Sequence, residues 1–211
     1  MKIAIVGAGG FAREVADLAR LLGMDVAGFV GEPVAGDPAL RFPLLGGDEA
    51  LPSLRSHGVE GAIVAVGKGL VRERLLAHCD AVGLALPVVV HPSATILTSI
   101  AFGAGTIVYP GAVVMTDCRI GRGVLLNSGA TLGHDVVIGD CASVNPGAHL
   151  AGRIRVGARS VIGIGTSIRE GVRIGADTTV GAGSVVVKDL PDGVVAYGVP
   201  AAVRSPGGSL R

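Results

Sequence analysis

Large aromatic side chains are almost absent from this chain. Aromatic residues make up 3% of the 211 residues and Trp does not occur, although hydrophobic residues reach 49%. The apolar interior must therefore consist mainly of Val, Ile, Leu and Ala, which indicates a narrow core. An excess of charge is missing as well: the formal net charge is +1, which gives no electrostatic reason to expect a nucleic acid or an anionic membrane surface as partner.

Cysteine and long apolar runs are also scarce. The three cysteines are an odd number without the spacing of a zinc site, which suits a reducing cytoplasm better than a disulfide-bonded protein. No stretch reaches the length of a transmembrane helix, and the first residues read as the start of a strand rather than as a signal peptide. We therefore expect a soluble cytoplasmic protein with no membrane partner.

An apolar residue occurs at every sixth position through the second half of the chain. The positions are Val90, Ile96, Phe102, Val108, Val114, Ile120, Leu126, Leu132, Ile138, Val144, Leu150, Val156, Ile162, Ile168, Ile174, Val180 and Val186. Neither a helix (period 3.6) nor a strand (period 2) produces such a repeat. Hexapeptide repeats are typical of a parallel β-helix, in which three flat faces form each triangular coil.

Two further positions of the repeat support a β-helix. Four residues after each apolar position the residue is small or β-branched in nearly every repeat, which suits a tight interior near a corner. One residue after the apolar position glycine recurs, and we expect the backbone to turn sharply there. These glycines are Gly103, Gly121, Gly133, Gly139, Gly157, Gly163, Gly175 and Gly181.

The first ninety residues follow a different pattern. Short buried strands are expected over residues 2–7, 26–30, 62–66 and 86–90, and helices over residues 11–22, 48–57 and 71–82. Strands that alternate with helices predict a small parallel α/β domain. We therefore divide the chain into a Rossmann-like domain, residues 1–90, and a β-helix domain with a C-terminal tail, residues 91–211.

A glycine-rich turn follows the first strand. The sequence from Gly7 to Ala12 matches G-x-G-x-x-A between a strand and a helix, the setting of a dinucleotide site. The domain is only about half the size of a dinucleotide fold, and Gly31-Glu32 is a weak form of its acidic ribose contact. The turn therefore predicts either a smaller phosphorylated ligand or a purely structural role.

The β-helix half contains three histidines. His91 precedes a proline at the domain junction, where a structural role is the simplest reading, and His149 has no evident partner in the sequence. His134 lies beside Asp135 on an expected coil edge among small residues, with Thr116 and Gly152 one coil away on either side. An imidazole beside a carboxylate is suited to general base catalysis near neutral pH. A surface histidine in a polar corner is the alternative.

Several segments together resemble a known family. KIAIVGAGGFAREV at the start, HPSATI at the junction, NSGATLGHDVVIGDCASVNPGAHLAG in the repeats and GVPA after them are similar to bacterial sugar O/N-acetyltransferases of the sialic acid O-acetyltransferase type. These are left-handed β-helix (hexapeptide) acyltransferases, and the nearest resemblance is to nucleotide-4-amino-sugar N-acetyltransferases. The resemblance implies an acetyl-CoA-dependent enzyme, a homotrimer with sites between subunits, and no metal.

The resemblance also implies roles for individual residues. His134 corresponds to the catalytic base and Asp135 to the acid that supports it. The contacts to the nucleotide-sugar acceptor fall on Gly9, Gly10, Phe11 and Gly67. The contacts to acetyl-CoA fall on Ser143, Gly152, Ile164 and Ala182.

The chain departs from the family at both substrate sites. Relatives often carry histidine where this chain has Phe11 and Ser143, and acidic residues where it has Gly31-Glu32. Phe11 removes a polar contact to the sugar nucleotide, whereas Ser143 can still donate a hydrogen bond to an acetyl carbonyl. The identity of the nucleotide therefore stays open, as does the role of His149.

Several functions remain possible from the sequence. The main expectation is N-acetylation of a nucleotide-linked 4-amino sugar, and the first alternative is O-acetylation of sialic acid or a related sugar. A zinc-dependent γ-carbonic anhydrase shares the solenoid, but His91, His134 and His149 are badly spaced for its three ligands. A non-catalytic sugar-nucleotide-binding protein and an O-acetyltransferase for a small molecule such as serine are the remaining alternatives.

Overall fold

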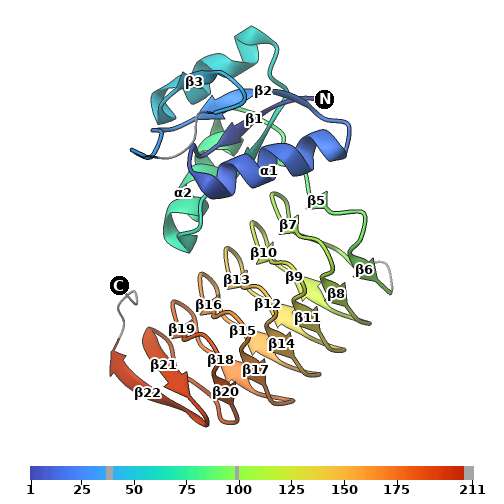
Figure 1. Cartoon of the computed structure of the whole chain (residues 1–211), viewed down its shortest axis with the longest axis vertical. Helices are drawn as coiled ribbons and strands as arrows, with labels where there is room; N and C mark the ends of the chain where they lie inside the picture. Colours follow the sequence, from blue (N-terminus) through green and yellow to red (C-terminus); the bar gives the residue numbers. More distant parts are fainter. Residues whose placement is uncertain (37–39, 98–99, 207–211) are drawn as a thin grey trace. The chain divides into compact units, whose positions relative to one another are not determined.

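The chain forms two compact units, Met1–Val89 and Val90–Arg211, in a computed structural model that describes residues 1–36, 40–97 and 100–206 (Figure 1). Among the described residues, no helix is long and apolar enough to cross a membrane.

The first unit is a parallel four-stranded sheet with strand order β3-β2-β1-β4. Its strands are β1 (Lys2–Val6), β2 (Asp25–Val30), β3 (Leu44–Gly46) and β4 (Gly61–Val64). Its helices are α1 (Gly10–Leu21), the 3₁₀ helix η1 (Asp48–His57) and α2 (Gly69–Ala81). The order of the strands reverses beside β1, because the chain adds β2 and β3 on one side of it and β4 on the other.

The pattern of buried residues explains why these strands and helices form where they do. Residues Ile3 to Val6 of β1 are all buried, as expected for a central strand of a parallel sheet. Helix α1 buries Val15, Leu18 and Ala19, whose spacing places them on one face. The strand expected over residues 86–90 is wrong in extent and place: only β5 (Val89–Val90) forms, and it belongs to a sheet of the β-helix. Strand β3 was not expected.

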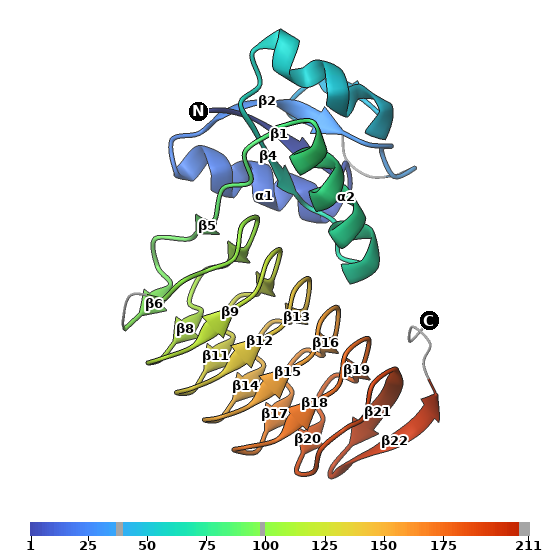
Figure 2. The same ribbon diagram turned by 180° about the vertical axis from the view of Figure 1, so that it is seen from behind.

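The second unit is a β-helix whose two-residue strands stack into three parallel sheets, as the rows of short arrows show from both sides (Figure 2). One sheet contains β5, β7 (Ile107–Val108), β10 (Leu125–Leu126), β13 (Ser143–Val144), β16 (Val161–Ile162) and β19 (Thr179–Val180). The second contains β6 (Thr95–Ile96), β8 (Val113–Val114), β11 (Thr131–Leu132), β14 (His149–Leu150), β17 (Ser167–Ile168) and β20 (Val185–Val186). The third contains β9 (Arg119–Ile120), β12 (Val137–Ile138), β15 (Arg155–Val156) and β18 (Arg173–Ile174).

The side chains at the repeated positions of the hexapeptide form the core of the β-helix. The apolar position of each repeat and the small position after it are buried in one continuous cluster from Val108 to Val186. Buried hydroxyls in the small position donate to backbone carbonyls of the next coil: Thr106 Oγ1 bonds to Gly121 O at 2.9 Å and Ser160 Oγ to Gly175 O at 2.6 Å. These bonds satisfy polar groups that would otherwise be costly to bury.

The recurrent glycines have a different role from the one expected. The left-handed turn of each repeat falls two residues later, at φ +61° for Asp135 and +64° for Gly147, for example. At Gly133 and Gly139 the constraint is space, because a Cβ would lie 2.7 Å and 2.6 Å from backbone atoms of the next coil. Glycine therefore allows adjacent coils to approach closely rather than the chain to turn.

This distinction predicts the effect of two glycine substitutions. Gly139→Ala places a methyl group 2.6 Å from Ala158 N and should lower the free energy of unfolding by about 1–3 kcal/mol. Gly129→Asn should be nearly neutral, since Gly129 has φ +67° with nothing within 4 Å of its Cβ position and Asn adopts left-handed conformations readily. Thermal unfolding of both variants measures the difference. Equal destabilisation of the two would contradict this account of the glycine position.

The C-terminal tail is a β-hairpin. Strands β21 (Val194–Gly198) and β22 (Ala201–Pro206) are antiparallel, and β21 extends the first sheet beside β19. The GVPA segment, residues 198–201, forms the turn between them. The hairpin thus continues the β-helix beyond its last coil.

An ion pair links two coils at one corner. Arg159 donates through Nε and Nη2 to both carboxylate oxygens of Asp177 at 2.7 Å each. These hydrogen bonds, and the positive charge, hold the pKa of Asp177 below its usual range. The resulting stabilisation is present above about pH 4, the pKa of an unfolded Asp, and is lost as the pH falls through the lower folded pKa.

Asp177→Asn should therefore destabilise the protein at pH 7 and have a smaller effect near pH 2. The expected loss is at most about 1 kcal/mol, because half of the Asp177 side chain is exposed to solvent. Asn also tolerates the left-handed backbone at this position, φ +53°. Unfolding midpoints of the variant and the unsubstituted protein, measured at both pH values, test this; an undiminished difference in acid would argue against it.

Candidate active site

His134 and Asp135 form a hydrogen-bonded pair at the corner between β11 and β12. His134 Nδ1 lies 2.7 Å from Asp135 Oδ2, and the two side chains are 50% and 53% exposed. Asp135 has φ +61°, a left-handed conformation that Asp tolerates, and its N–H donates to Thr116 O at 3.0 Å. The expected pair therefore forms within one tight turn.

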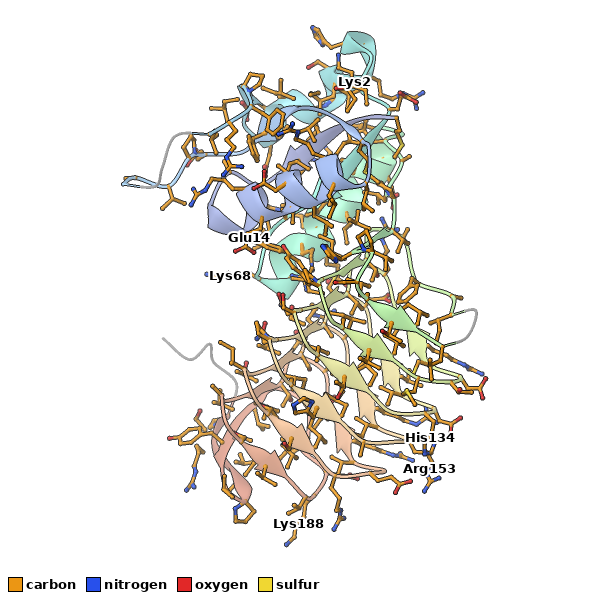
Figure 3. The ribbon with its side chains drawn as sticks, turned by 45° about the vertical axis from the view of Figure 1, so that its right-hand side comes forward. Lys2, Glu14, Lys68, His134, Arg153 and Lys188 are labelled. Carbon is orange, nitrogen blue, oxygen red and sulfur yellow. The ribbon has the colours of Figure 1, made fainter. Side chains whose placement is uncertain are left out.

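The hydrogen bond between His134 and Asp135 determines which ring nitrogen of His134 can accept a proton. A carboxylate only accepts hydrogen bonds, so Nδ1 of a neutral His134 carries the proton and Nε2 keeps its lone pair. The ring lies over Gly152 in the next coil: a Cβ on Gly152 would stand 2.5 Å from Nε2. His134 and Arg153 lie next to each other at this edge of the β-helix, where Arg153 N donates to His134 O at 2.8 Å (Figure 3). The site thus presents an unprotonated nitrogen above a residue without a side chain.

A cavity of about 500 Å³ borders this edge. Its lining residues include Asp117, Asp135, Arg119 and Arg155, but not His134. Sequence reasoning did not identify Asp117 or the two arginines as site residues, although the arginines occupy the outward position directly before the apolar position of their repeats. The cavity can hold a ligand with groups of both charges.

Cys118 also lines this cavity, but its environment is structural. Burial raises the pKa of its thiol, and Sγ donates to Gly133 O at 3.1 Å. A thiol that is kept protonated is a poor nucleophile. Cys118 therefore has the packing role that its small interior position indicates.

The other residues expected to bind acetyl-CoA lie elsewhere on the β-helix. Ser143 begins β13 and is 4% exposed, whereas Ile164 is 59% exposed in the corner after β16. Ala182 occupies the equivalent corner one coil later, where Gly183 N donates to Ile164 O at 2.8 Å. Of the four residues, Gly152 is the one whose position adjoins the His134 ring.

The two remaining histidines of the β-helix do not belong to this pair. His149 projects from β14, and its Nδ1 is 2.9 Å from Thr131 Oγ1. His91 Nδ1 accepts a hydrogen bond from Ser93 N at 3.0 Å within a turn. Among the residues that the structure describes, no group of three or more His, Cys, Asp or Glu side chains could hold a metal ion.

The residues expected to bind the acceptor lie at the carboxyl edge of the first unit's sheet. Gly9 precedes α1 and Gly10 begins it, while Phe11 is half-buried. Gly67 follows β4 and has nothing within 4 Å of its Cβ position. Gly7 is a structural requirement instead, because φ is +129° and a Cβ would lie 2.5 Å from Ala65 O. Glycine has two separate functions in this turn.

Comparison with known families assigns both units. Residues 2–78 match the family described as the PglD N-terminal domain. Residues 117–152 and 153–188 match the bacterial transferase hexapeptide family (six repeats). The comparison with curated proteins gives no match.

Solved structures match over nearly the full chain. PerB from Caulobacter crescentus, in complex with CoA and GDP-perosamine, is 39% identical with a TM-score of 0.92, covering 97% of this chain and 98% of that one. The chain belongs to the hexapeptide sugar acetyltransferases. The acetyltransferase domain of PglB from Neisseria gonorrhoeae, in complex with acetyl coenzyme A, is 36% identical with a TM-score of 0.87, covering 96% and 98%. WeeI from Acinetobacter baumannii is 27% identical with a TM-score of 0.84, covering 97% and 100%.

This assignment confirms the fold expected from the repeats. The sugar acetyltransferase has a Rossmann-like N-terminal domain followed by a left-handed β-helix, and it uses acetyl-CoA as co-substrate. A left-handed parallel crossover is otherwise rare. Family membership also favours acetyl transfer to a nucleotide-linked amino sugar over the carbonic anhydrase and serine acetyltransferase alternatives.

Proposed function

We propose that this acetyltransferase transfers the acetyl group of acetyl-CoA to the amine of a nucleotide-linked 4-amino sugar, with His134 as general base. The observation that carries the proposal is the 2.7 Å contact between His134 Nδ1 and Asp135 Oδ2, which assigns the proton of a neutral imidazole to Nδ1 and leaves the Nε2 lone pair available. It is supported by a relative, 39% identical over nearly the whole chain, that is solved with CoA and GDP-perosamine.

The chemistry follows from the pair. The amine nitrogen of the acceptor attacks the carbonyl carbon of the thioester while His134 Nε2 removes a proton from it, and the negative charge of Asp135 stabilises the imidazolium that forms. The C–S bond of the tetrahedral intermediate then breaks, and the departing sulfur takes the proton. The products are the acetamido sugar and free CoA. A backbone N–H or the Ser143 hydroxyl donates to the oxyanion of the intermediate.

We further propose that the site is completed by a second copy of the chain. Gly152 lies under His134, but Ser143, Ile164 and Ala182 lie on other parts of the same β-helix. One extended CoA molecule can contact both sets if it lies between neighbouring β-helices of a homotrimer. The nucleotide of the acceptor binds at Gly9, Gly10, Phe11 and Gly67. None of the three cysteines, all of them described, is in a disulfide, which fits a cytoplasmic enzyme.

A thiol-release assay tests the reaction. The enzyme is incubated with acetyl-CoA and, in separate reactions, UDP-, GDP- and dTDP-linked 4-amino sugars and sialic acid. We expect free CoA with at least one of the amino sugars and a product that carries an N-acetyl group by mass spectrometry. Release with sialic acid alone would support O-acetylation instead. No release with any acceptor, from protein that still binds acetyl-CoA, would contradict the proposal.

A further inference from the structure

Arg72 is a fully buried guanidinium in the first turn of α2 that the proposed reaction does not use. Its side chain is 0% exposed. Nη1 donates to Val66 O at 2.7 Å and to Gly67 O at 2.9 Å, the carbonyls of the loop that joins β4 to α2. Arginine stays charged at any physiological pH, and burying that charge is costly unless its hydrogen bonds are well made. The side chain therefore imposes one conformation on this loop.

The geometry of the peptide bonds determines which backbone groups of this loop point away from Arg72. In a trans peptide the C=O and N–H groups point in opposite directions. Because the carbonyls of Val66 and Gly67 point toward Arg72, the N–H groups of Gly67 and Lys68 point away from it. Both residues are exposed, and among the described parts of the chain no acceptor is bonded to either N–H. Two open donors thus face outward beside the Lys68 ammonium.

The loop lies where a parallel sheet binds ligands. Ala65 N donates to Val6 O at 2.7 Å, and Gly7 packs against Ala65, so the loop adjoins the glycine-rich turn after β1. Strands β1 and β4 are neighbours at the point where the strand order reverses, the usual place of a nucleotide crevice. Neither α1 nor α2 has an acidic residue in its first turn or a side chain capping its start. Donors at helix starts that carry no carboxylate in the first turn favour an anion.

We propose that Arg72 is a positioning residue that aims the N–H groups of Gly67 and Lys68, and the Lys68 side chain, at the diphosphate of the acceptor. The inference rests on the proposed function for the nature of the ligand. Arg72 does not touch the diphosphate itself; it acts through the loop carbonyls.

Steady-state kinetics of Arg72→Lys and Arg72→Met test the role of the guanidinium. We expect Arg72→Met to raise KM for the nucleotide sugar about 10- to 100-fold, because hydrogen bonds to a charged group are misplaced. KM for acetyl-CoA and kcat should stay within about 2-fold, since the acetyl-transfer residues are on the β-helix. Arg72→Lys should fall between, as an ammonium can still donate to the carbonyls.

Arg74 on the same helix provides the matched control. Its side chain is exposed and pairs with Asp48 at 3.2 Å, so Arg74→Met should keep the KM of the unsubstituted enzyme. Folded Arg72→Met and Arg72→Lys variants with an unchanged KM for the nucleotide sugar would overturn the inference. A fall in kcat with unchanged KM would do the same.

A second pair of variants tests the loop without altering the buried side. Lys68 has φ −71°, which proline can adopt, so Lys68→Pro removes the side chain and the N–H, whereas Lys68→Ala removes the side chain only. Calorimetric titration with UDP, GDP and dTDP compares them. We expect Lys68→Ala to bind more weakly than the unsubstituted protein and Lys68→Pro to bind about 10-fold more weakly again. Equal affinity of the two variants would contradict a role for the N–H.

The same titration separates failure of this inference from failure of the proposed function. If the unsubstituted protein binds no nucleoside diphosphate and releases no thiol with any amino sugar, the proposed function is wrong. If it binds one of them but the Arg72 and Lys68 variants bind equally well, only the positioning role is wrong.

Discussion

Replacing His134 with alanine should lower kcat about 10²–10⁴-fold, the usual contribution of a positioned general base. In the proposed mechanism the imidazole Nε2 removes the amine proton, and the residues proposed to bind the nucleotide sugar lie on the N-terminal unit. KM for acetyl-CoA and for the nucleotide sugar, the unfolding midpoint and the oligomeric mass should therefore change little. A thiol-release assay under saturating substrates measures kcat directly.

His149→Ala is the matched control for this experiment. His149 is an exposed histidine of the same β-helix, bonded to Thr131 and not to Asp135. Its loss should leave kcat within about 2-fold of the unsubstituted enzyme. A near-normal kcat for His134→Ala would remove His134 from the mechanism, and a large loss for His149→Ala would place that histidine in the site instead.

Adding a single methyl group at Gly152 should inactivate the enzyme almost as effectively. The Cβ of an alanine would stand 2.5 Å from His134 Nε2 and 2.6 Å from Cε1, so the imidazole must move away. Displacement of a catalytic group by about 1 Å can cost about 100-fold in rate. Because half of the His134 side chain is exposed and free to move, we expect Gly152→Ala to leave the unfolding midpoint nearly unchanged.

A double-mutant cycle separates displacement of His134 from other effects of this methyl group. In a His134→Ala background the steric conflict is absent, so Gly152→Ala should lower kcat by no more than about 2-fold further. If the two losses multiply instead, Gly152 acts on the bound acetyl-CoA and not through the imidazole. The resemblance to the family assigned Gly152 to acetyl-CoA, and the cycle distinguishes that role from the steric one.

The β-helix was predictable because each of its coils is made of consecutive residues. Leu126 stacks on Val108 and Val144 at a constant sequence interval, so the buried column is visible as a period in the sequence. The same register alone places Gly152 one coil from His134. The sequence did not show why residues 133 and 139 are glycine, because the reason is the close approach of backbone atoms of the neighbouring coil.

The N-terminal domain was less predictable. Its strands pair over long sequence distances, as in β1 with β4, and their extent depends on those partners. The segment 86–90 has the composition of a strand, yet only Val89–Val90 pairs, with a sheet of the β-helix. The short strand β3 carries little apolar signal of its own and is defined by its pairing with β2.

The candidate site also has residues that the sequence predicts and residues that only the structure reveals. His134 and Asp135 are adjacent in sequence, so their contact required only a turn, and the pattern indicated them correctly as neighbours. Arg72 carried no comparable signal, because an arginine on a helix is normally solvent-exposed and only the packing of α2 buries it against the Val66 and Gly67 carbonyls. The roles proposed for Ser143, Ile164 and Ala182 also depend on a second copy of the chain.

The sequence by itself determined the repeating fold and the position of the histidine–carboxylate pair, because both follow from local order and a constant period. Only the tertiary structure decided which nitrogen of His134 is available, why Gly152 has no side chain, and how the loop after β4 is held. These features depend on contacts between residues of different coils or between a helix and the loop before it. Such contacts are set by packing in three dimensions, and no period in the sequence encodes them.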